Sequence, residues 1–169
     1  INTVQIKSPV YFLENFFPVH AAAFKRHLFE QVRFNESQWF IEDVRFYLEL
    51  AMLPDVNLFY VDEPAFISFH RDFRNKISLS TSNDSEYWKM IFSNYDFVAS
   101  RYQVSFKDKI TLSKLLIINY HIVDTTYKLL IKQNCKKIWH YFLGLPRLFQ
   151  NRILYKGLFY SSRLIKILK

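Results

Sequence analysis

Two adjacent carboxylates, Glu42 and Asp43, are the side chains in this sequence best suited to catalysis. They come directly after an apolar triplet and at the expected start of a helix, where backbone amides can hold a carboxylate toward a pocket. A carboxylate within hydrogen-bond reach of a hydroxyl can act as a general base. The plainer alternative is a charge pair that only complements the positive end of the helix dipole, and the two residues alone leave both interpretations open.

A polar, basic segment over residues 70–82 is the second candidate for a site, and we expect it to form a loop. It begins with His70 and Arg71 and also contains Arg74. Cations in such a loop can neutralise a bound anionic group. The alternative is an ordinary solvated turn.

Glycine and cysteine usage excludes several other kinds of site. The only two glycines are Gly144 and Gly157, so the first 143 residues contain none. A P-loop or a dinucleotide-binding fingerprint needs glycine where the backbone approaches a pyrophosphate, and neither can exist here. The single cysteine, Cys135, excludes an internal disulfide, and no Cys/His spacing resembles a zinc site.

Apolar spacing and helix-capping signals predict the elements that position the candidate residues. Asn83 with Glu86, and Ser105 with Asp108, have the spacing of capping boxes at helix starts, and Pro54 is expected to end a helix. The expected helices cover 21–33, 42–53, 84–102, 105–133 and 147–168, and the expected strands cover 56–61 and 65–69.

Charge divides the chain. Residues 1–100 carry 9 Lys/Arg and 13 Asp/Glu, whereas residues 101–169 carry 14 Lys/Arg and 2 acidic residues. The expected helices and strands predict an α/β class protein, and the break in charge divides it into two parts. A mixed α+β piece over residues 1–81 is followed by a basic, all-α extension over residues 82–169. The first piece suits catalysis, and the second suits contact with an anionic partner.

A series of short motifs runs through residues 10–80. It consists of a helix, the turn Phe34-Asn35-Glu36, the helix start Glu42-Asp43, the segment Tyr60-Val61-Asp62-Glu63-Pro64, and His70-Arg71 followed by Asn75-Lys76-Ile77-Ser78. In this order the motifs resemble the C-terminal half of the catalytic domain of family 2 glycosyltransferases, which have the GT-A fold. The match covers under half of the chain.

The resemblance implies a role for each matching residue on the acceptor side. Asp43 would be the catalytic base that deprotonates the acceptor sugar hydroxyl, and Glu42 would orient that base or bind the acceptor. Glu36 would also contact the acceptor. Trp39, just before the pair, would stack on a sugar face, although packing in the core is an equally good interpretation of this residue.

On the donor side, the resemblance implies that Arg71 neutralises the leaving diphosphate, with His70 and Arg74 as further donor contacts. His70 stands where the family usually has an aromatic residue, and Lys76 replaces the usual serine. The family's Asp-x-Asp motif, which holds a metal ion and the sugar nucleotide, occurs nowhere in this chain. The resemblance therefore implies that the nucleotide-binding half, with its Mg or Mn ion, lies upstream and that this piece alone is inactive.

The last expected helix carries a basic stripe. Arg152, Lys156, Arg163 and Lys166 fall within about 80° of one another on a helical wheel, with an apolar side opposite. This pattern suits an anionic bilayer surface, and no segment reaches the roughly 20 apolar residues of a spanning helix. A helix packed on the domain or against a second copy is the alternative, and nucleic acid is a less favoured anionic partner.

These observations lead to a prediction of function. We expect a cytoplasmic glycosyltransferase, attached to the inner face of a membrane, that moves a sugar from a nucleotide donor to a saccharide or lipid-linked acceptor. The reaction would belong to bacterial surface polysaccharide synthesis, and it would invert the configuration at the anomeric carbon of the transferred sugar. The alternative is a non-enzymatic helical module that binds an anionic partner. The sequence is also compatible with a homo-oligomer.

Overall fold

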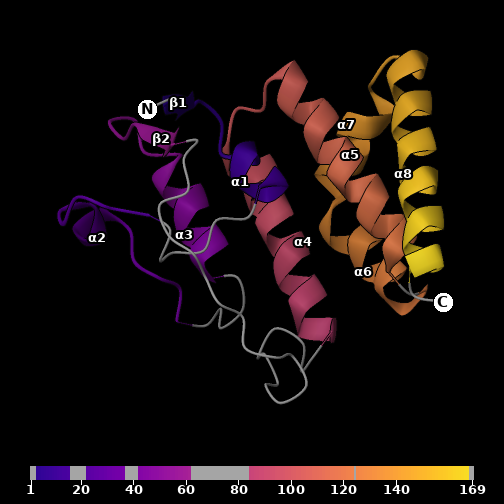
Figure 1. Ribbon diagram of the computed structural model, residues 1–169, viewed down its shortest axis with the longest axis horizontal. Coiled ribbons are helices and arrows are strands. Elements are labelled where there is room, and N and C mark those ends of the chain that lie inside the picture. Colours follow the sequence, from indigo (N-terminus) through magenta and orange to yellow (C-terminus); the bar gives the residue numbers. More distant parts are fainter. Residues whose placement is uncertain (1–2, 16–21, 37–41, 62–83, 124, 168–169) are drawn as a thin grey trace. The chain divides into compact units, whose positions relative to one another are not determined.

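The computed structural model in Figure 1 describes residues 3–15, 22–36, 42–61, 84–123 and 125–167. The chain forms two compact units, Ile1–Ile91 and Phe92–Lys169, which are described separately below. The predicted boundary between residues 81 and 82 lies outside the described residues. The described part is mostly helical with one small sheet, which confirms the predicted α+β region followed by an all-α region.

The sheet in the first unit has two strands. β1 (Thr3–Ile6) pairs antiparallel with β2 (Leu58–Val61), and Thr3 lies opposite Val61. The predicted strand over 56–61 is therefore confirmed, two residues shorter at its start. Its side chains alternate as a half-buried strand requires, with Phe59 and Val61 exposed and Leu58 turned inward. The predicted strand over 65–69 lies outside the described residues.

The three helices of the first unit are short: α1 (Val10–Glu14), α2 (Leu28–Gln31) and α3 (Glu42–Leu50). The predicted helix over 21–33 is wrong in length, because the described part of this segment is helical only in α2. Val32 then leaves the helix in an extended conformation (φ −131°, ψ 134°).

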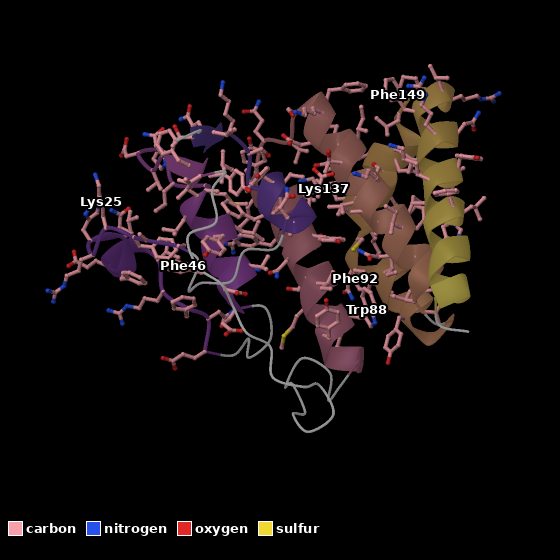
Figure 2. The ribbon with its side chains drawn as sticks, in the orientation of Figure 1. Lys25, Phe46, Trp88, Phe92, Lys137 and Phe149 are labelled. Atoms are coloured by element: carbon pink, nitrogen blue, oxygen red, sulfur yellow. The ribbon has the colours of Figure 1, made fainter. Side chains whose placement is uncertain are left out.

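Phe46 on α3 is the centre of an aromatic cluster (Figure 2). Its side chain is 1% exposed, and the centroid of the Phe34 ring, stacked on it, lies 4.4 Å away. Phe24 and Phe29 add ring contacts at 5.2 and 5.5 Å. Leu28 and Val32 are buried in the same cluster, and Phe24 packs against it. These three residues are spaced by four, so the apolar spacing of the sequence matches the buried side although the helix is shorter than predicted.

The second unit contains helices only, within the residues that the structure describes. α4 (Asp84–Arg101) begins in the first unit and continues into the second. It is followed by α5 (Phe106–Ile122), α6 (Thr125–Asn134), α7 (Lys136–Leu143) and α8 (Arg147–Ile167). α5 contacts both α7 and α8, and Figure 1 shows α5 beside α8. Buried leucine and isoleucine side chains from four of these helices form the core: Leu112, Leu116, Ile131, Ile138 and Ile153.

Ser105 starts α5 as predicted. Its hydroxyl accepts a hydrogen bond from the Asp108 amide at 3.2 Å, and the Asp108 carboxylate accepts one from the Ser105 amide at 3.3 Å. This reciprocal pair is the capping box that the spacing indicated. The single helix predicted over 105–133 is wrong, however, because Val123 takes an extended conformation (φ −75°, ψ 151°) and ends α5. Burial of the Val123 side chain, which is 5% exposed, stabilises the break.

Gly157 lies where α8 contacts α5. A Cβ atom at this position would lie 2.8 Å from Cγ2 of Ile117 and 3.0 Å from Cδ2 of His121. Phe149, labelled in Figure 2, packs edge-to-face on Phe106 at 5.8 Å near the start of the two helices. Glycine lowers helix stability, but here it removes the side chain that would separate α8 from α5.

Replacing Gly157 with leucine is expected to lower the free energy of unfolding by about 1–3 kcal/mol, because the added side chain overpacks the contact with Ile117. The exposed neighbour Lys156 provides the matched control, since Lys156→Leu adds leucine to the same helix without a clash. Urea unfolding of both variants measures the difference. Equal midpoints would show that α8 does not need glycine at this contact.

Cys135 is expected to be unreactive in the folded chain. Its side chain is fully buried, and its thiol lies 4.0 Å from the Phe92 carbonyl oxygen. Loss of hydration, together with the negative charge of Asp96, raises the pKa of Cys135 from 9 to about 12. Although Cys135 precedes α7, whose N-terminal dipole favours a thiolate, burial is the larger effect.

Labelling with Ellman's reagent at about pH 8 tests this expectation, because only the thiolate reacts. We expect slow labelling of the folded chain and rapid labelling in urea. The raised pKa also implies that stability falls as pH rises from 9 toward 12, since the unfolded chain loses this proton first. Complete labelling of the folded chain within minutes would contradict the burial of Cys135.

Candidate active site

Glu42 and Asp43 form the first turn of α3, as the sequence predicted. Both residues are half-buried. The Val44 amide donates a hydrogen bond of 2.9 Å to Oδ1 of Asp43. The unpaired amides of a first helical turn carry partial positive charge, which stabilises an ionised carboxylate at this position.

The rest of α3 fixes the position of this turn. Phe46, Leu48 and Leu50 are buried with at most 1% of their surface exposed. On the other side of the helix, Nε of Arg45 donates to Oε1 of Glu49 at 2.8 Å, an ion pair one turn apart. A carboxylate used as a base has to be held in one place, and a helix anchored by buried side chains provides that.

Tyr47 lies one helical turn after Asp43 and was not among the predicted site residues. Its ring is 4% exposed and stacks on Phe12 of α1 at 5.0 Å, nearly parallel. Burial, and to a smaller extent the charge of Asp43, raises the pKa of Tyr47 to about 12. The phenol therefore stays protonated near a carboxylate. The spacing of four residues from Asp43 is the sequence signal that could have identified it.

Glu36 is the other described residue of the predicted acceptor side. It occupies an exposed turn two residues after Phe34, whose ring stacks on Phe46. The turn is thus tied to the aromatic cluster beneath α3. The remaining predicted contacts lie outside the described residues: Trp39, His70, Arg71 and Arg74.

The predicted divalent metal has no site in the part of the chain that the structure describes. No group of three or more His, Cys, Asp or Glu side chains there could hold an ion. The resemblance implies that the ligands of the Mg or Mn ion belong to the nucleotide-binding half, so the described residues do not test this prediction.

Comparison with known proteins does not assign this chain to a family. The chain matches no protein-family model, no curated protein sequence and no solved structure.

The predicted basic stripe falls on α8, and the structure describes part of it. Arg152 and Lys156 are exposed, whereas the side chains of Arg163 and Lys166 lie outside the described set. The helical wheel placed Ile153 and Leu154 together on an apolar side, but only Ile153 is buried. No described helix is both long enough and apolar enough to cross a membrane.

Proposed function

We propose that this chain forms the acceptor-side half of a GT-A fold, family 2 glycosyltransferase. The observation that carries the proposal is the Glu42-Asp43 pair, half-buried in the first turn of a helix whose other face is anchored in an aromatic core. The order of elements supports it, because α2, the Glu36 turn, α3 and β2 follow one another as in that family.

In the proposed reaction, Asp43 accepts the proton of an acceptor hydroxyl. The acceptor oxygen then attacks the anomeric carbon of the donor sugar as the bond to the nucleoside diphosphate breaks. One carboxylate opposite the leaving group is sufficient, no covalent intermediate forms, and the configuration inverts. Glu42, beside the base, orients it or hydrogen-bonds a neighbouring hydroxyl of the acceptor.

The leaving group is a nucleoside diphosphate, whose negative charge increases as the bond breaks. Arg71 would neutralise that charge, with His70 and Arg74 as additional donor contacts. The Asp-x-Asp motif and its divalent ion would belong to a nucleotide-binding half outside this chain, since no such motif occurs in it. The acceptor is a saccharide or a lipid-linked saccharide of bacterial surface polysaccharide synthesis, on the cytoplasmic side.

The second candidate function is a helical module that binds an anionic partner. The charge of the second unit favours it, because residues 92–169 carry 14 Lys/Arg against 3 acidic residues. In that case the resemblance of the first unit would have no catalytic meaning. A transfer assay separates the two candidates, since the module predicts no turnover.

The assay uses the protein as its gene encodes it. A panel of nucleotide sugars is supplied with and without a mixture of saccharide acceptors, and release of nucleoside diphosphate is measured. Acceptor-dependent release supports the transferase. A folded protein that neither binds nor cleaves any nucleotide sugar in the panel would overturn the proposal.

A further inference from the structure

The side of α8 that faces away from α5 carries exposed apolar and basic side chains together. α8 has 21 residues, about 31 Å of helix. Ile153 and Gly157 are buried on the inner side, and Gly157 contacts Ile117 and His121 of α5. Over residues 147–159, where the structure describes the side chains, the opposite side faces solvent.

Leu148, Arg152 and Tyr155 form a stripe on this outward side, because they are spaced by four and three residues. Leu148 is 62% exposed and Tyr155 is 71% exposed. Phe159, four residues further and 43% exposed, continues the stripe, and Lys156 is exposed beside it. We call Leu148, Arg152, Tyr155 and Lys156 the α8 outer face. Large apolar side chains are not usually exposed together unless they bind a partner.

The positive charge of the second unit indicates which kind of partner binds the α8 outer face. The second unit has an excess of 11 positive charges, and Arg147, Arg152 and Lys156 of α8 are all exposed. Asp108 does not offset them at the surface, since it is buried and its carboxylate is held in the capping box of α5. The partner of the α8 outer face is therefore anionic.

We infer that the α8 outer face docks on an anionic lipid bilayer. Leucine can enter the boundary of the hydrocarbon, tyrosine suits the headgroup level, and arginine and lysine reach the lipid phosphates. The outward side chains of residues 148–156 lie on one side of a helix, which suits contact with a planar surface. The inference does not depend on the transferase proposal, because docking requires neither donor nor acceptor.

The structure favours a bilayer over the other occupants. A second copy would bring two sets of like charges together, which repel. Nucleic acid would contact the cations and could stack on Tyr155, but it offers Leu148 only a polar phosphate surface. An acidic protein surface remains as an outcome that the experiment detects.

Vesicle co-sedimentation of the whole chain tests the inference. Vesicles of phosphatidylcholine with phosphatidylglycerol are compared with phosphatidylcholine alone, and binding is expected only to the anionic vesicles. Arg152→Gln with Lys156→Gln removes two of the charges and should weaken partitioning about thirtyfold. Lys136→Gln with Lys137→Gln, two exposed residues of α7, removes the same charge elsewhere and should change it much less.

The apolar contribution is tested with Leu148→Ser and Tyr155→Ser together. This pair leaves the charge unchanged, so a loss of partitioning similar to that of the charge variant supports insertion of the outer face. Phe59→Ser, at an exposed site in β2, is the matched control. Circular dichroism confirms that each variant keeps its helix content.

Tyr155→Trp provides a fluorescence signal that changes when the side chain enters the bilayer, and that electrostatic attraction to the surface alone would not change. Its emission should shift to the blue on anionic vesicles and be quenched by brominated lipid acyl chains. Loss of binding that is equal for the α7 and α8 charge variants, or an unquenched tryptophan, would overturn the inference. Displacement from vesicles by short duplex DNA at equal phosphate concentration would point instead to nucleic acid, and binding only to acidic polypeptides would point to a protein partner.

Discussion

Replacing Asp43 with asparagine in the complete enzyme is expected to lower the rate of sugar transfer by about two to four orders of magnitude, the usual contribution of a general base. Asparagine has the same size and retains an oxygen that can accept the hydrogen bond from the Val44 amide. The start of α3 is therefore preserved. What is lost is the ability to take the acceptor proton, so kcat falls while donor binding remains.

Glu42→Gln is the matched control for this substitution. Glu42 occupies the same helical turn and is half-buried to a similar degree, but the proposed mechanism gives it no proton to accept. Its replacement should change acceptor KM more than kcat. Steady-state kinetics of both variants, with donor binding measured by calorimetry, make the comparison. Turnover of the Asp43 variant near that of the wild type would refute the assignment of the base.

The second large effect is expected in the core beneath the candidate site. Phe46→Ala should destabilise the first unit by about 3–5 kcal/mol, because it removes a buried ring and leaves a cavity. The loss also removes ring contacts with Phe24, Phe29 and Phe34. These segments are joined to α3 through Phe46, so the substitution releases the Glu36 turn and α3 together.

Hydrogen exchange measured residue by residue reports this loss locally. The Ala51 amide, which donates to the Tyr47 carbonyl at 2.9 Å, should exchange at least about a hundred times faster in Phe46→Ala. Amides of α5 in the other unit should change little. Phe59→Ala, which truncates a ring that is 59% exposed, should leave both sets unchanged. If the Ala51 amide stays protected in Phe46→Ala, the aromatic cluster does not stabilise α3.

The elements that the sequence predicted well depend on local signals. Ser105 and Asp108 are three residues apart and bond each other's backbone, so the start of α5 follows from four residues. Glu42 and Asp43 mark the start of α3 in the same way, through the charge preference of a first helical turn. Such signals act within one turn and need no tertiary partner.

The elements that the sequence missed depend on distant partners. β1 is only four residues long, and its partner β2, more than fifty residues later, supplies its hydrogen bonds. The break at Val123 lies inside a pattern that reads as continuous helix, and burial of that side chain favours the extended backbone. The short length of α2 also depends on a distant partner, because Leu28 and Val32 are buried against Phe46 without a longer helix.

The candidate site shows the same division. The sequence placed a Glu-Asp pair at a helix start, but the tertiary structure decided that Tyr47 is buried near Asp43, because Phe12 of α1 supplies the stacking surface.

On α8, the sequence by itself determined a basic helix of the right length. It could not determine which side faces solvent, because a helical repeat fixes only the angles between side chains. The close approach of α5 at Gly157 decided that orientation, burying Ile153 and leaving Leu148, Arg152 and Tyr155 outside.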